Sequence, residues 1–186
     1  MSADLAPWKT LERTRLFSAG PITEIAQEKV LLPDGRVVPD YYTATMGDYA
    51  LVYAVTREGT VLVLRQYKHG CRRVCLTFPG GYVAPGEDPA AAVERELLEE
   101  TGYRLETLTP LGSFVANANQ GCNTAHLFRA DGCRYERPAE SGDLEEMQLV
   151  QMSPEELSTS AAIADMAVLG YVALALLAER VARRTS

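Results

Sequence analysis

Residues 81–103 read GYVAPGEDPAAAVERELLEETGY, and the interpretation of the whole chain starts from this stretch. Asp88 has the side chain of a good N-cap, and Pro89 suits the first position of a helix. Gly102 suits the position just beyond a helix end, where the backbone often turns left-handed. The stretch therefore predicts a helix from Pro89 to Thr101.

The predicted helix is unusually acidic near its end. Its segment 94–100 contains the following charged residues: Glu94, Glu96, Glu99 and Glu100, against Arg95. Such runs are usually solvated faces with i,i+4 ion pairs, but here Glu96 and Glu100 form a like-charge i,i+4 pair near the negative end of the helix dipole. At about 100° per residue, Glu96, Glu99 and Glu100 share one face. Val93 and Leu97 flank this face, so we expect part of it near the core, where a bound divalent cation would offset the repulsion.

Carboxylate oxygens suit hard cations, so Mg²⁺ is the expected metal, and Mn²⁺ or Ca²⁺ are alternatives. Mg²⁺ commonly binds together with substrate phosphates. The preceding loop contains Gly80, Gly81 and Gly86, which allow the backbone to approach a metal or a phosphate closely. The loop and helix together predict a site for a metal-bridged diphosphate.

The overall composition is that of an ordinary globular protein. The chain has 186 residues, of which 47% are hydrophobic and 23% charged, and this length favours a single domain, residues 1–186. A formal charge of −7 disfavours general binding to nucleic acid or to anionic membranes. The longest apolar run, Met166–Ala178, is too short for the ~20 residues that span a bilayer.

The expected location is the cytoplasm. The N-terminal residues lack a basic segment followed by an apolar one, which is the pattern of a secretory leader. The cysteines form no CxxC pair, and with two histidines they do not have the spacing of a familiar zinc site. We therefore interpret them as packing residues or idle thiols: Cys71, Cys75, Cys122 and Cys133.

Alternating apolar runs predict strands on both sides of the acidic helix. Thr23–Leu32 and Val37–Thr45 are expected to form a hairpin around the turn Pro33–Arg36. A capping box at Ser153 predicts a short helix, and Ala162–Arg183 is expected to be one long final helix. The pattern suggests a mixed sheet between helices. The other expected strands are Ala50–Thr56, Thr60–Tyr67, Val74–Phe78, Leu108–Val115, Thr124–Ala130 and Met147–Met152.

The spacing of Gly81, Glu87 and the run Arg95–Gly102 resembles the Nudix box, the signature of Nudix hydrolases. Each fixed position is filled, and the one departure is Tyr103, where an aliphatic residue is usual. Outside the box, Val61–Tyr67 is similar to a strand of the ADP-ribose pyrophosphatase branch. The resemblance implies an α/β/α sandwich with a mixed sheet, here preceded by an N-terminal hairpin segment, residues 1–46, before a catalytic core, residues 47–186.

The resemblance also implies roles for particular residues. Metal ligands by position are Glu96, Glu99, Glu100 and the carbonyl oxygen of Gly80. Arg95 is expected to pair with Glu87 and hold the loop on the helix, although such a pair is also common as a plain surface contact. In this branch a glutamate of a later loop acts on the attacking water. Counting back from Met147–Met152 points to Glu145, with Glu146 as its neighbour, and a merely solvated loop is the alternative.

The reaction implied by the family is hydrolysis of a nucleoside diphosphate linked to another moiety. ADP-ribose is the first expected substrate, giving AMP and ribose 5-phosphate. Other nucleoside diphosphate sugars are close alternatives, because the stretch Val115–Gly121 lacks the proline common in enzymes specific for ADP-ribose. A non-catalytic nucleotide sensor is an alternative of another class, which the complete box disfavours.

Three side chains are candidates for substrate contacts. Arg65 is a candidate for a charge-assisted contact with a phosphate, and a structural salt bridge is the alternative. Trp8 and Tyr42, with Tyr41 beside it, are candidates for stacking on the base, with core or dimer packing as the alternative. The N-terminal segment of this branch often crosses to a second subunit, so we expect a homodimer.

Overall fold

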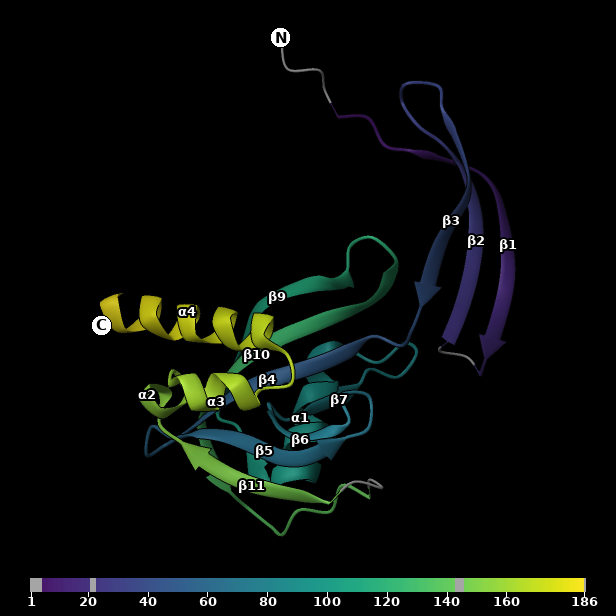
Figure 1. Cartoon of the computed structure of the whole chain (residues 1–186). Helices are drawn as coiled ribbons and strands as arrows, with labels where there is room; N and C mark the ends of the chain where they lie inside the picture. The colour runs from purple at the N-terminus through teal and green to yellow at the C-terminus, as the bar shows by residue number, and fades with distance from the viewer. Residues whose placement is uncertain (1–4, 21–22, 143–145, 186) are drawn as a thin grey trace. The chain divides into compact units, whose positions relative to one another are not determined.

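The computed structural model describes residues 5–20, 23–142 and 146–185 (Figure 1). The chain forms two compact units, which we describe separately. The first consists of the described residues up to Asp48 together with Phe114–Thr124, and the second of Tyr49–Ser113 together with the described part of Ala125–Ser186. The single domain expected from the sequence remains a prediction.

The N-terminal unit is an antiparallel arrangement of β1 (Lys9–Ala19), β2 (Thr23–Leu31) and β3 (Val37–Thr45), which run side by side in Figure 1. The predicted hairpin is confirmed, because β2 pairs with β3 and Gly35 N donates to Leu32 O at 3.0 Å. Gly35 has φ 86°, a conformation that glycine adopts without strain.

Strand β1 was not expected from the sequence. Its side chains are exposed along the whole strand, so the period-2 apolar pattern that reveals a half-buried strand is missing. Backbone pairing with β2 and cross-strand ion pairs hold it instead. Arg13 contacts Glu24 at 2.5 Å, and Lys29 contacts Glu12 at 2.8 Å.

The second unit is built on a mixed sheet, as predicted. β9 (Thr107–Asn117) and β10 (Gly121–Tyr135) extend into it from the first unit, and β10 is parallel to β4 (Tyr49–Thr56). β4 is antiparallel to β5 (Val61–Lys68), and β5 to β11 (Met147–Met152). The shorter strands are β6 (Arg73–Thr77) beside β5, β7 (Gly80–Tyr82) beside β4 and β8 (Tyr103–Arg104) beside β10.

Helices cover both faces of this sheet, which gives the expected α/β/α sandwich. On one face, α1 (Pro89–Thr101) packs Val93 and Leu97 against Val52 of β4. On the other face, Val172 of α4 (Leu169–Thr185) packs with Tyr53 and Phe78. The alternation along β4 thus sends successive side chains to different cores.

The C-terminal helices correct one expectation. In place of one helix over Ala162–Arg183, the chain forms α3 (Ser160–Asp165) and α4, after the short α2 (Pro154–Leu157). Met166 makes a bridge to Leu76 of β6, and Ala167 N donates to Leu76 O at 2.9 Å. This tertiary pairing interrupts an apolar run that by itself favours continuous helix. No helix within the described residues is both long and apolar enough to cross a bilayer.

Candidate active site

Helix α1 has the bounds that the sequence predicts. The Asp88 side chain accepts a hydrogen bond from Ala90 N at 3.0 Å, and Gly102 N donates to Leu98 O at 2.9 Å. Gly102 is left-handed, with φ 75°, and a Cβ there would lie 1.9 Å from Arg137 O. The caps therefore fix both ends of the helix that carries the acidic face.

Glu100 is the buried member of the acidic face. Its side chain lies beneath β7, where Oε2 accepts a hydrogen bond from Gly80 N at 2.7 Å, and the residue is 7% exposed. A buried carboxylate is costly unless it is hydrogen-bonded, so this contact with the backbone helps to offset the cost. The expectation that part of the acidic face lies near the core is confirmed at this residue.

Glu96 lies against the second residue of β7. A Cβ at Gly81 would lie 2.5 Å from the Glu96 carboxylate, so only glycine leaves room for this side chain in its present place. Gly80 and Gly81 pair with Leu51 and Ala50 of β4, which fixes the strand above α1. Glu96 and Glu100, one helical turn apart, thus face the same short stretch of backbone.

Arg95 contacts three carboxylates of the loop and helix. Its guanidinium contacts Glu87 at 3.2 Å, Glu96 at 2.8 Å and Glu99 at 3.2 Å, and it donates to Tyr82 O at 3.4 Å. The predicted contact between Arg95 and Glu87 is present. These acidic partners raise the pKa of Arg95 above its ordinary value, so it remains a cation.

Glu87 ties the loop to this cluster. Its carboxylate accepts a hydrogen bond from Ala84 N at 2.9 Å, which is the main reason that its pKa lies below the ordinary value, and Arg95 lowers the pKa further. Glu87 is therefore an anion at neutral pH. It anchors Arg95 from the loop side.

The donor set suits a hard divalent cation, although it is not arranged as a finished cage. Among the described residues, no three or more acidic, histidine or cysteine side chains converge closely enough to hold a metal ion. Glu96 and Glu99 are instead turned to Arg95, which supplies positive charge to the acidic face. The oxygen-only chemistry of these carboxylates fits a hard divalent cation once Glu96 and Glu99 turn away from the guanidinium.

The acidic loop after β10 begins against the end of α1. Glu140 N donates to Glu99 O at 2.8 Å, and Glu136 N donates to Gly102 O at 2.9 Å. The Glu140 side chain is exposed and contacts Arg137 at 2.7 Å. Glu145 lies outside the described residues, and Glu146 is exposed immediately before β11.

The predicted substrate contacts lie in both units. Arg65 is an exposed residue of β5, opposite Leu76 and Gln148 in the second unit. Trp8 and Tyr42 belong to the N-terminal unit, and both are about half exposed. Trp8 packs edge-on against Tyr41, with 5.8 Å between the ring centroids. The roles of these residues in binding remain predictions.

Sequence reasoning missed a cavity of about 330 Å³ on the α4 face of the sheet. Leu51 and Phe78 form part of its apolar wall, and Lys68 contributes an ammonium group. The hydroxyl groups of Tyr49 and Tyr171 meet in a hydrogen bond at its edge, and burial raises the pKa of Tyr49. Its walls come from strands, the β5–β6 turn, the α3–α4 connection and α4, so no local sequence motif predicts it.

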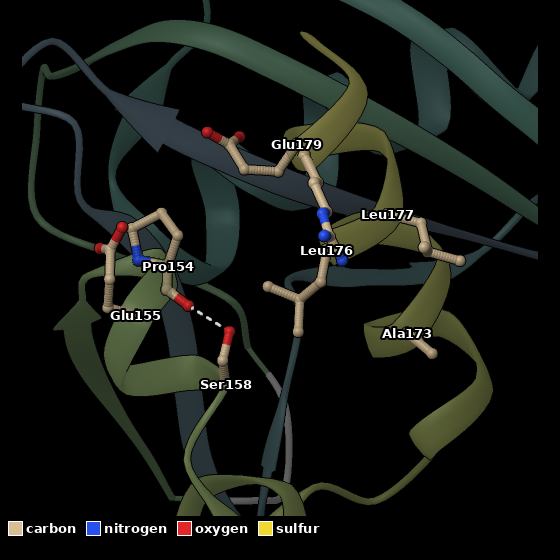
Figure 2. Close-up of a pocket in the computed structure, with 8 residues that line it drawn as sticks. Pro154, Glu155, Ser158, Ala173, Leu176, Leu177 and Glu179 are labelled. Atoms are coloured by element: carbon tan, nitrogen blue, oxygen red, sulfur yellow. Dashed lines mark hydrogen bonds between the residues drawn. The ribbon is translucent and has the colours of Figure 1, made fainter. Parts of the chain in front are cut away.

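A larger open groove, about 610 Å³ in volume, lies between α2 and α4 (Figure 2). Leu176 and Leu177 contribute apolar surface, and Ser158 Oγ donates to Pro154 O at 2.7 Å. The carboxylate of Glu179, which also lines the groove, is paired with Arg129. None of the groove residues belongs to the box, so we assign no catalytic role to it.

Comparison with known proteins places the chain in a family. Residues 46–169 match the NUDIX domain family. An ADP-ribose pyrophosphatase of Bacillus subtilis (strain 168) is 32% identical over 123 residues, which cover 66% of this chain and 65% of that enzyme's length. The methanol dehydrogenase activator of Bacillus methanolicus is 29% identical over 149 residues, which cover 80% of each chain.

The fold is similar to that of a solved protein over nearly its whole length. The crystal structure of an ADP compounds hydrolase superposes with a TM-score of 0.81, covers 98% of both chains and is 19% identical in sequence. Fold and box together are those of a Nudix hydrolase. The chain belongs to the NUDIX domain family.

Proposed function

We propose that this chain hydrolyses, with a divalent metal ion, the diphosphate bond of a nucleoside diphosphate joined to another moiety. ADP-ribose is the proposed first substrate, with AMP and ribose 5-phosphate as products. The observation that carries the proposal is that two box glutamates of α1 face strand β7 and a third contacts Arg95. Glu100 accepts a hydrogen bond from Gly80 N, Glu96 lies against Gly81, and Glu99 pairs with Arg95.

The same residues define where a metal would be held. Glu96, Glu99, Glu100 and the carbonyl oxygen of Gly80 are the proposed ligands, with Mg²⁺ as the proposed ion and Mn²⁺ as a substitute. A bound divalent ion neutralises diphosphate charge, activates water and stabilises the leaving oxygen. Arg95 contacts Glu87 as well, so it can stay anchored to the loop when Glu96 and Glu99 turn to the metal.

The choice of ADP-ribose rests on the likeness to the Bacillus subtilis ADP-ribose pyrophosphatase. Other nucleoside diphosphate sugars remain close alternatives, because the loop beyond the box lacks the proline that is common in enzymes specific for ADP-ribose. In that loop the side-chain oxygen of Asn117 accepts hydrogen bonds from Asn119 N at 3.0 Å and Gln120 N at 3.2 Å. This oxygen therefore shapes the turn rather than standing ready for a sugar hydroxyl.

A substrate panel tests the proposal. ADP-ribose, other nucleoside diphosphate sugars, dinucleoside polyphosphates and nucleoside triphosphates are each incubated with the protein and Mg²⁺, and kcat/KM is measured. We expect ADP-ribose to rank first, with nucleotide sugars next. A rise in Tm with ADP-ribose but no turnover of any compound would support the non-catalytic sensor instead.

The acidic loop is the proposed source of the group that orients or deprotonates water. Glu140 N donates a hydrogen bond to Glu99 O, so the acidic loop starts beside α1. Strand β11, which pairs with β5, follows the loop. We expect Glu145→Gln to lower kcat by about 10²–10⁴-fold with little change in KM, the usual range for loss of a general base.

Two neighbouring variants control for the register of the loop. Glu140→Gln removes an exposed carboxylate that already has Arg137 as its partner, so kcat should stay within about threefold of wild type. Glu146→Gln tests the neighbour of Glu145. If all three single variants keep kcat in that range, the loop does not supply the base and the role returns to the box glutamates.

A homodimer formed through the N-terminal unit is also proposed. Large apolar side chains of β1 are exposed to solvent on this unit. They include Leu16 and Phe17, each more than half exposed. Exposed aromatic and apolar groups of this kind favour a self-complementary interface. Light scattering at micromolar concentration should give twice the 20.3 kDa of one chain.

A charged residue introduced into the apolar surface of β1 tests whether this surface forms the dimer interface. Phe17→Asp should shift the particle toward the mass of one chain, while Glu58→Gln, an exposed change in the β4–β5 turn, should leave it unchanged. A wild-type particle of 20.3 kDa would exclude the dimer under these conditions.

The cytoplasm is the proposed location. All four cysteines are free, including the exposed Cys71, which suits a reducing compartment.

A further inference from the structure

Arg73 of β6 is hydrogen-bonded to the end of α3. Its guanidinium donates to Ala164 O at 3.2 Å, to Asp165 O at 3.4 Å and to Met166 O at 2.9 Å. The last carbonyl groups of a helix lack partners within the helix, and a basic side chain can bind them. The three contacts therefore attach the end of α3 to β6, and the function proposed above assigns no role to Arg73.

Backbone contacts reinforce this attachment. Met166 forms a parallel bridge with Leu76 of β6, and Ala167 N donates to Leu76 O at 2.9 Å. Met166 is buried. Arg73 and Leu76 thus hold the connection between α3 and α4, residues 166–168, from two positions along β6.

This connection is also a wall of the cavity of about 330 Å³ on the α4 face. Residues 166–168 all line the cavity, and Lys68 and Phe78 contribute other parts of its wall. Phe78 lies two residues before Gly80, whose N atom donates to Glu100 in the proposed metal site. The cavity wall therefore continues into the strand beside the proposed metal site.

The charge of Lys68 gives a reason for the direction of the Arg73 side chain. The two residues are directly opposite each other in the β5–β6 ladder, where like charges repel. The Arg73 guanidinium is turned to the carbonyl oxygens at the end of α3, whereas Lys68 lies in the cavity wall. One cation thus holds the connection, and the other lies beside the cavity.

We propose that Arg73 is a positioning residue for substrate binding, an inference that rests on the function proposed above. Arg73 holds residues 166–168 in the place where they complete the cavity wall. The apolar surface and the ammonium group of Lys68 suit a part of the substrate that carries both an uncharged ring and phosphate groups. Because Arg73 acts on this wall and the box glutamates act on the metal, loss of Arg73 should weaken substrate binding and leave the chemical step intact.

Hydrogen exchange tests the attachment in the full chain without substrate. Arg73→Ala should speed exchange of the amides of residues 166–168 by at least about tenfold, because part of their attachment to β6 is lost, while exchange in α1 stays unchanged. Arg72→Ala is the matched control, since it removes an equal charge from the neighbouring exposed position and keeps the backbone hydrogen bond to His69 O. Exchange in this control should match the wild type.

Steady-state kinetics with ADP-ribose and Mg²⁺ tests the role in binding. Arg73→Ala should raise KM by about tenfold and keep kcat within about threefold of wild type, whereas a general loss of structure would lower the apparent kcat. Arg73→Lys should bring KM back to within about threefold of wild type, because an ammonium group can also donate to the carbonyl groups of α3. Arg72→Ala should leave both constants within about threefold of wild type.

Unchanged exchange of residues 166–168 in Arg73→Ala would overturn the proposal. So would faster exchange with a wild-type KM, a fall in kcat at constant KM, or an equal rise in KM in Arg72→Ala. If the wild type binds ADP-ribose in calorimetry but hydrolyses none of it, the proposed function fails by itself. The Kd for ADP-ribose then decides the role of Arg73, because a value about tenfold weaker in Arg73→Ala would support it and an equal value would overturn it.

Discussion

Replacing Glu100 by Gln is expected to lower kcat for ADP-ribose by about 10²–10⁴-fold, the scale on which loss of a group that acts in the transition state is felt. The substitution keeps the shape of the side chain, and its amide oxygen can still accept the hydrogen bond from Gly80 N. It removes a negative charge from the proposed metal site. Steady-state kinetics at saturating Mg²⁺ measures the effect.

The control for this prediction lies on the same helix. Glu94 is an exposed residue of α1, so Glu94→Gln removes an equal charge away from β7. Its kcat should stay within about threefold of wild type, and both variants should melt near the wild-type Tm. A Glu100→Gln protein with wild-type kcat would show that the box is not used for catalysis.

Removal of divalent ions is expected to abolish turnover, and Mg²⁺ or Mn²⁺ should restore it. Without a metal, Arg95 contacts the carboxylates of Glu87, Glu96 and Glu99, and an anionic diphosphate would still meet an acidic face. The measurement is the initial rate in excess EDTA and after titration with each ion.

Binding of the metal has a signature that does not depend on catalysis. An ion that binds the folded chain raises its Tm by mass action, so Mg²⁺ should stabilise the wild type more than Glu100→Gln. Full turnover in excess EDTA would contradict the proposed role of the metal.

The sequence predicts those elements correctly whose bounds are set by neighbouring residues, and it fails where distant residues decide the structure. Asp88, Pro89 and Gly102 act within a single turn of α1, and the helix has the expected bounds. Strand β1 depends on pairing with β2, and the break at Met166 depends on β6, which is distant in sequence. Neither cause leaves a local pattern.

In the candidate site, too, features set by neighbouring residues were predicted and features set by distant residues were not. Helical periodicity was enough to place Glu96, Glu99 and Glu100 on one face. The hydrogen bond from Gly80 N to Glu100 was not foreseen, because it depends on β7 pairing with β4 above the helix. The cavity near Tyr49 is formed by several elements and was missed for that reason.

Product analysis in ¹⁸O-labelled water tests the central claim most directly. The protein is incubated with ADP-ribose and Mg²⁺, and both products are identified by mass spectrometry. Hydrolysis of the diphosphate bond predicts AMP and ribose 5-phosphate in equal amounts, with one ¹⁸O atom in one of the two products. Intact ADP-ribose after prolonged incubation with folded, Mg²⁺-supplied protein, or cleavage at any bond other than the diphosphate, would contradict the account.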